Sequence, residues 1–183
     1  MQFKITKQWI KKFLLMLISV TLMGYSVSLL VLTDMGTDSC SAMNYGVSAK
    51  IGMSFGTYQL LLNIVLLVFV VIFDRSLIGT GTIGNMVLVG YTADFCSHIW
   101  RDICHIPVSL PLGIRIGILI PALIVFVTAA ACYMNSGCGM APYDAVSFII
   151  NDKLEKATNK DNLFKIVRFF FDLFAMTIGI ITG

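Results

Sequence analysis

Long apolar runs without charge alternate with short polar stretches along most of this chain. The runs cover residues 13–33, 55–73, 78–93 and 116–143, and a more polar one extends from 163 to 183. A helix rises about 1.5 Å per residue, so about 20 residues cross the roughly 30 Å apolar core of a bilayer. The pattern therefore predicts several membrane-spanning helices.

Two shorter segments, 39–51 and 142–154, are neither loops nor full spans. Each of them follows glycine and polar residues, and 13 helical residues cover only roughly 20 Å. We interpret both segments as half-helices that follow a break in a longer helix. The residues expected to form the breaks are Gly36, Gly137, Gly139 and Pro142.

Composition narrows the class of protein. Of the 183 residues, 57% are hydrophobic and 13% are charged, whereas a soluble domain carries about 25% charged residues. This balance excludes a soluble enzyme, a nucleic-acid-binding protein and a disordered chain. The expected partner is the lipid bilayer. The net charge of +3 is modest, and the positions of the basic residues along the chain are more informative than their number.

The basic residues suggest an orientation. Lys4, Lys7, Lys11 and Lys12 precede the first run, which is too long for the usual secretory signal, so we expect a retained span with a cytoplasmic N-terminus. If the short segments complete crossings, Lys50, Arg101 and the group Lys153, Lys156 and Lys160 join them on one side. If the short segments are re-entrant, Lys50 and Arg101 face outward. We favour the crossing arrangement because it agrees with the positive-inside rule.

The two halves of the chain follow one plan. The stretch from Gly36 to Ala42 aligns with Gly139 to Ala145, and Gln59 and Asn63 align with Arg168 and Asp172. Matched breaks in two halves are typical of transporters with a central binding site, although glycines also simply allow close helix packing.

We therefore predict an all-α polytopic transmembrane bundle made of two structural repeats. The first repeat is 1–103, with spans of about 13–33, 39–51, 55–73 and 78–100. The second is 104–183, with spans of about 112–135, 142–154 and 163–183. The second repeat lacks its last span, so either the chain is a truncated product or a partner completes the bundle.

Three motifs resemble the YczE/YyaS/YitT family of bacterial membrane proteins. They are Gly139-x-x-Pro142-Tyr143-Asp144, Arg168-x-x-x-Asp172 and Gly79-Thr-Gly-Thr82. The resemblance implies a multi-pass protein of the bacterial inner membrane and little about its chemistry. The first half departs from the pattern, because Ser39, Cys40 and Ser41 stand where the second half has Pro142, Tyr143 and Asp144.

The charges inside the apolar part are the candidate site residues. Arg168 and Asp172 lie one helical turn apart, and Asp172 lies near the middle of its span, where ionisable residues are functional hypotheses by default. Asp144 follows Pro142 and either caps a short helix or, with Asp38, lines a substrate or proton site. A purely structural Arg–Asp pair is the alternative. Gln59 and Asn63 are the uncharged counterparts in the first half.

Other motifs do not carry chemistry. Gly79-Thr-Gly-Thr-Ile-Gly84 matches a dinucleotide fingerprint but lacks the βαβ context, so close helix packing explains it better. Cys96, His98, Cys104 and His105 match no structural zinc spacing. We expect no catalytic residues, no metal, no cofactor and no nucleic-acid partner, and hence no enzyme.

The leading functional hypothesis is permease-like transport of a small solute or ion, with a site between the two breaks. The alternative is a non-transporting membrane partner that assists the assembly, secretion or regulation of another protein. Either function is compatible with a homo-oligomer or with a membrane-protein partner.

Overall fold

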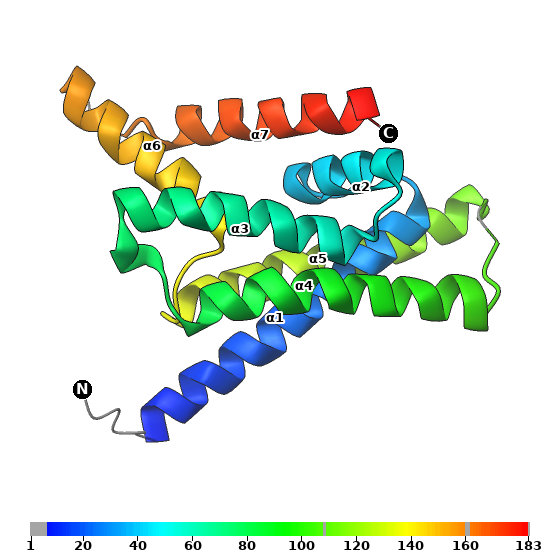
Figure 1. Ribbon diagram of the computed structural model, residues 1–183. Coiled ribbons are helices and arrows are strands. Elements are labelled where there is room, and N and C mark those ends of the chain that lie inside the picture. Colours follow the sequence, from blue (N-terminus) through cyan, green and yellow to red (C-terminus); the bar gives the residue numbers. More distant parts are fainter. Residues whose placement is uncertain (1–6, 108, 160–161, 183) are drawn as a thin grey trace.

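The computed structural model describes residues 7–107, 109–159 and 162–182, and these residues form helices joined by short connections (Figure 1). Lys4, Lys160 and Gly183, which entered the predictions above, lie outside them. The described part contains no strand, and the predicted all-α helix bundle is confirmed. The elements in chain order are α1 (Lys7–Thr33), α2 (Ser39–Ile51), α3 (Phe55–Phe73), the 3₁₀ turn η1 (Arg75–Leu77), α4 (Thr80–His98), the π-helical η2 (Ile99–Ile103), α5 (Leu112–Asn135), α6 (Pro142–Thr158) and α7 (Phe164–Thr182).

Three helices, α1, α3 and α5, are long and apolar enough to cross a membrane. Their outward surfaces stay apolar, as Ile124 and Val127 of α5 illustrate, with exposed fractions of 62% and 63%. Exposed apolar area costs about 25 cal/mol per Å² in water and nothing comparable in lipid. The chain is therefore a membrane protein.

Contacts along α1 give the relative directions of the long helices. Gly84 near the start of α4 packs on Met16, and Trp100 just beyond the end of α4 donates to Ser28 Oγ at 3.2 Å, so α1 and α4 run parallel. The Arg115 side chain near the start of α5 donates to the backbone carbonyls of Thr33 and Asp34 at the end of α1. Helix α5 is therefore antiparallel to α1.

These directions overturn the crossing arrangement for α2. Helix α3 begins next to the end of α4, where Gly56 N donates to Asp94 Oδ2 at 2.8 Å, and this is also the end of the bundle where α1 stops. The chain between α1 and α3 therefore enters the bundle and returns to the same end. As a result, Lys50 and Arg101 lie at the end of the bundle that carries Asp34.

Helix α6 returns in the same way at the opposite end. Helix α5 stops there, since the chain that follows it contacts the start of α4 at Gly79. Helix α6 runs back to that end, where Lys153 Nζ lies 3.5 Å from the ring centroid of Phe73, the last residue of α3. The positive-inside rule favoured the crossing arrangement only through Lys50 and Arg101, because both arrangements place the basic N-terminus with Lys153 and Lys156. Helix packing decides it.

The glycines at the start of α4 allow a backbone to approach closely, as predicted, but the neighbour is a break rather than a helix. Gly81 N donates to Cys138 O at 2.7 Å, and Met140 N donates to Leu77 O at 3.0 Å. A Cβ on Gly79 would lie 2.1 Å from Cys138 O. The residues between α5 and α6 are thus joined to the start of α4 by main-chain bonds.

Replacing Gly79 with alanine is expected to lower the free energy of unfolding by about 1–3 kcal/mol, because the added methyl group overlaps the Cys138 carbonyl. Thermal unfolding of the purified protein in detergent measures the change. The matched control is Gly113→Ala, since a Cβ on Gly113 has no neighbour within 4 Å. Equal unfolding temperatures for the two variants would contradict the close contact.

Candidate functional site

The two breaks have the same backbone geometry. Gly36 and Gly139 have φ angles of +108° and +106°, a region that side chains rarely adopt. Two residues later, Asp38 and Ala141 are the N-caps of α2 and α6, with φ and ψ of −65° and 157° and of −62° and 142°. Both half-helices therefore start at corresponding points, and both starts lie inside the bundle.

Sequence explains why helices begin at these two points. The Asp38 carboxylate accepts a hydrogen bond from Ser41 N at 3.1 Å, which satisfies one free donor of the first turn of α2. In α6 the first residue is Pro142, which has no N–H and whose φ suits a helix start. Gly137, with φ of +66°, follows α5. The predicted break residues thus lie at the breaks.

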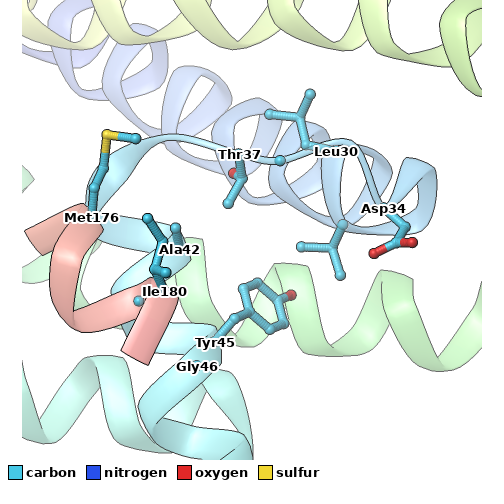
Figure 2. Close-up of a pocket in the computed structure, with 11 residues that line it drawn as sticks. Leu30, Asp34, Thr37, Ala42, Tyr45, Gly46, Met176 and Ile180 are labelled. Carbon is cyan, nitrogen blue, oxygen red and sulfur yellow. The ribbon is translucent and has the colours of Figure 1, made fainter. Parts of the chain in front are cut away.

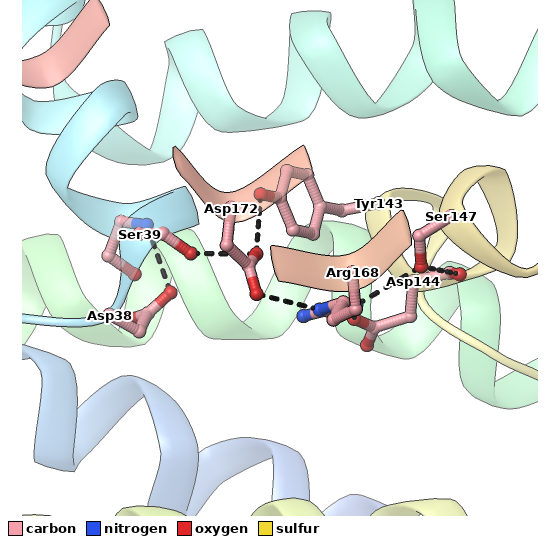
Figure 3. Close-up of polar contacts among 8 residues, drawn as sticks. Asp38, Ser39, Tyr143, Asp144, Ser147, Arg168 and Asp172 are labelled. Atoms are coloured by element: carbon pink, nitrogen blue, oxygen red, sulfur yellow. Dashed lines mark hydrogen bonds and ion pairs between the residues drawn. The ribbon is translucent and has the colours of Figure 1, made fainter. Parts of the chain in front are cut away.

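Helix α7 passes both of these helix starts and supplies the charges between them (Figure 3). Arg168 Nε donates to Asp172 Oδ2 at 2.9 Å, and Arg168 Nη1 donates to Asp144 Oδ1 at 2.5 Å and to Ser147 Oγ at 3.2 Å. One guanidinium thus bridges a carboxylate on its own helix and one on α6. The predicted Arg168–Asp172 pair is formed, and Asp144 belongs to it.

Asp172, on α7, makes side-chain hydrogen bonds to both half-helices, α2 and α6. Its Oδ1 atom accepts one hydrogen bond from Ser39 Oγ and one from the Tyr143 hydroxyl, each at 2.9 Å. Ser39 is the first residue of α2 and Tyr143 lies in the first turn of α6. The side chain of Asp172 therefore connects both half-helix starts to α7.

Asp38 lies beside this cluster without an ion pair to it. Its carboxylate accepts from Ser41 N and from the Thr37 hydroxyl, at 3.1 and 3.3 Å. Figure 3 shows Asp38 on one side of Asp172 and Asp144 on the other. Both Asp38 and Asp172 are within electrostatic range of Asp144.

The cluster is half-buried and carries a negative balance. The side chains of Arg168, Asp144 and Asp172 keep 32%, 26% and 30% of their surface accessible. The guanidinium of Arg168 contacts two carboxylates, and Asp38 beside the cluster is a third carboxylate that it does not contact. Each helix start adds a positive partial charge of about half an elementary charge, which favours carboxylates at this position.

Gln59 and Asn63 are buried on α3, with 6% and 5% of their surface exposed. Neither makes a described hydrogen bond to Arg168, Asp172 or Asp144. Gln59 Oε1 lies against α4, 3.3 Å from where a Cβ on Gly90 would be. The structure therefore does not bring these two candidates together with the charged cluster.

Sequence reasoning missed the hydroxyl partners and one arginine. Ser39, Tyr143 and Ser147 complete the cluster. Ser39 and Tyr143 could have been found from the sequence, because each of them directly follows one of the two breaks. Arg115 was not singled out, although it binds the end of α1 and pairs with Asp34 Oδ2 at 3.3 Å. Hydroxyl side chains in apolar helices are too common to be distinctive without known contacts.

The cysteine and histidine residues near the end of α4 are not gathered into a group. His98 Nδ1 contacts Asp102 Oδ2 at 2.5 Å, and both side chains are exposed. Within residues 7–107, 109–159 and 162–182, no three His, Cys, Asp or Glu side chains are placed to hold a metal ion.

A cavity of about 620 Å³ lies between the end of α1, α2 and the second half of α7 (Figure 2). Thr37, next to Asp38, lines it on one side, and Met176, one turn after Asp172, lines it on the other. Tyr45 adds an aromatic face. The cavity thus approaches the cluster from the end of the bundle that carries Asp34.

These features define a class: a helical membrane protein with two half-helices that enter from opposite ends and start at a shared charged cluster. The chain belongs to DUF6198, a family of unknown function whose model matches residues 10–183. It is 26% identical over 144 residues to the "Uncharacterized protein YyaS" of Bacillus subtilis (strain 168), which is 77% of this chain and 68% of the relative. The expected YyaS-like relationship is confirmed. No solved structure matches the chain.

Replacing Arg168 with lysine is expected to lower the free energy of unfolding by about 1–2 kcal/mol, a value reduced for partial exposure. The planar guanidinium reaches two carboxylates from two nitrogens, and a single ammonium lacks this geometry. Thermal unfolding in detergent provides the measurement.

The control is Lys165→Arg, a charge-conserving change at an exposed position of the same helix. It is expected to leave the unfolding temperature unchanged. An Arg168→Lys protein as stable as the wild type would show that the bridge contributes nothing.

Proposed function

We propose that this protein is a permease-like carrier of a small solute or ion in the bacterial plasma membrane. One observation carries the proposal: two half-helix starts from opposite ends of an apolar bundle meet at the cluster of Arg168, Asp144 and Asp172. Discontinuous helices whose ends converge inside the membrane form the substrate and ion sites of many secondary transporters.

The energetics of the cluster favour function over simple packing. A charge near the centre of a membrane helix costs about 2.5–3.5 kcal/mol on insertion scales, so such residues are rare and mostly functional. An apolar trio at these positions would pack without that cost. Retaining one arginine and two aspartates there is better explained by a ligand than by stability.

The opposed directions of the two breaks support the predicted internal repeat. Helices α1 and α5 are antiparallel, and the breaks that follow them share the φ angle of Gly36 and Gly139. Repeats of inverted topology place the two half-helices on opposite sides of one central site. We infer that 1–103 and 104–183 are such repeats.

The basic residues support a cytoplasmic N-terminus. In the described ranges, the end of the bundle where α1 begins carries Lys7, Lys11, Lys12, Arg75, Lys153, Lys156 and Lys165. The opposite end carries Lys50, Arg101 and Arg115. The positive-inside rule assigns the first group to the cytoplasm. The cavity lined by Thr37 and Met176 then approaches the cluster from outside.

Orientation is tested with single cysteines in a background whose five native cysteines are replaced. In intact cells, Lys50→Cys is expected to react with a membrane-impermeant maleimide, and Lys153→Cys is expected to react only after the membrane is opened. Labelling of both, or of neither, in intact cells would place the two residues on one side and contradict the re-entrant arrangement.

Transport is tested in proteoliposomes with a panel of labelled amino acids, nucleosides, sugars and ammonium compounds. The wild type is expected to move at least one of them faster than empty liposomes. Asp172→Asn is expected to reduce that flux about tenfold or more, because the amide no longer balances Arg168. The control, Asp152→Asn, changes an exposed carboxylate on α6 and is expected to retain the flux.

No flux for any solute, together with an unchanged cellular phenotype when Asp172→Asn replaces the wild type, would contradict the proposal. That outcome would favour the alternative of a non-transporting membrane partner, which predicts stable co-purification with another membrane protein. The same purified protein, examined for flux and for a co-purifying partner, therefore distinguishes the two functions.

A further inference from the structure

The start of a helix covers the second break, which follows α5, and the first break, which follows α1, differs in this respect. At the second break, Gly81 N donates to Cys138 O at 2.7 Å, and Met140 N donates to Leu77 O at 3.0 Å. The connection from α3 to α4 and the first turn of α4 thus satisfy the main chain of the second break.

The corresponding main-chain groups of the first break have no such bonds. In the alignment of the two halves, Met35 and Thr37 take the places of Cys138 and Met140. Among the residues that the structure describes, no main-chain hydrogen bond reaches Met35 O or Thr37 N. Lipid cannot form hydrogen bonds with peptide groups, so peptide groups inside a membrane are paired as a rule. One acceptor and one donor of the first break are therefore available to another segment.

The space beside the two break glycines shows the same difference. A Cβ on Gly139 would lie 2.4 Å from Gly79 N, whereas a Cβ on Gly36 would have no described neighbour within 4 Å. The cavity of about 620 Å³ is lined by Gly36 and Thr37, and also by Ile180 near the end of α7 (Figure 2). Helix α7 corresponds to α3, whose end leads into α4. The open space therefore lies where a counterpart of α4 would start.

Helix α5 also lacks the neighbour that α4 provides for α1. Gly24 of α1 packs so closely on α4 that a Cβ would lie 2.5 Å from Val89 O. Val127 precedes Gly139 by the same distance in sequence as Gly24 precedes Gly36, and it is 63% exposed. In an apolar stretch of 18 residues in each helix, 44% are buried in α1 and 17% in α5. The exposed side of α5 thus corresponds to a side of α1 that another helix covers.

We propose that the first break and α5 together bind one membrane-spanning helix of a separate membrane protein. This helix starts at the end of the bundle that carries Asp34. Its first turn donates to Met35 O, and the chain before it accepts from Thr37 N, as α4 and its connection do at the second break. The first turn carries glycine or another small residue, since a Cβ on Gly79 would overlap Cys138 O. The inference rests on the inverted repeat inferred above and does not require transport.

A second copy of this chain does not supply such a helix start. In the described ranges, α3 and α5 start at the required end, and both starts are engaged in their own bundle. Gly56 N at the start of α3 donates to Asp94, and Arg115 near the start of α5 binds the end of α1. Helices α1, α4 and α7 start at the opposite end, and α2 and α6 start inside the bundle. The proposed helix therefore belongs to a different polypeptide.

Photo-cross-linking of the full chain in its native membrane tests the contact. Benzoylphenylalanine replaces Met35 in one variant and Val127 in another, because these side chains are 42% and 63% exposed at the proposed contact. Both variants are expected to form an adduct with the same protein, identified by mass spectrometry. The control carries benzoylphenylalanine at Ile83 of α4, which is 61% exposed and lies at the opposite end from Met35, and it is expected not to trap that protein.

The cross-linked positions on the partner distinguish a bound helix from a chance neighbour. On α4, the residues that meet the second break and Gly24 are Gly81 and Val89, about 8 residues apart. The adduct from Met35 is therefore expected in the first turn of a membrane span. The adduct from Val127 is expected about 8 residues further along the same span.

The proposal is overturned if the two positions trap different proteins, lipid alone or nothing. It is also overturned if the adduct joins two copies of this chain or lies within one copy, because the helix would then come from this polypeptide. Adducts outside a membrane span, or in the reverse order along it, overturn it as well. A partner trapped in this geometry without flux in liposomes would contradict transport and support this inference.

Discussion

A helix that starts inside an apolar bundle leaves its first backbone N–H groups without partners, and this chain contains two such starts. At α2 the carboxylate of Asp38 accepts from Ser41 N, and at α6 Pro142 removes one donor and Asp144 lies in the first turn. These carboxylates then require a positive charge inside the bundle. Arg168 supplies it, and the position of α7 follows, because Arg168 and Asp172 must reach both helix starts at once.

Different hydrogen bonds hold the chain in place at the two breaks. At the first break, the carbonyls of Thr33 and Asp34 at the end of α1 accept from the Arg115 side chain, so a charged residue from α5 satisfies the last turn. At the second break, the main chain of Cys138 and Met140 bonds to the start of α4, and Gly79 and Gly81 leave room for it. The two breaks have one backbone geometry and two kinds of support.

Local signals located the breaks and the charged pair well. Gly36, Gly139 and Pro142 mark the helix starts because positive φ and the missing proline N–H act at a single residue, and Arg168 and Asp172 are one turn apart in any helix. The predicted crossing of α2 and α6 was wrong, because it depended on the positions of Lys50 and Arg101, and helix packing places both residues at the end of the bundle that carries Asp34. Gln59 and Asn63 share the spacing of Arg168 and Asp172, yet α3 directs at least Gln59 toward α4.

The sequence by itself determined the class of protein, the helices, the two breaks and the charges that need compensation, because each of these follows from hydrophobicity, helix periodicity or the conformation of one residue. Only the tertiary structure decided that Ser39 and Tyr143 share Asp172, that Arg168 bridges α7 and α6, and that both half-helices return to the end from which they entered. These are contacts between segments more than 20 residues apart, up to 133 for Ser39 and Asp172, and they depend on how the helices pack. Helix packing is set by many weak contacts at once, and no local pattern encodes it.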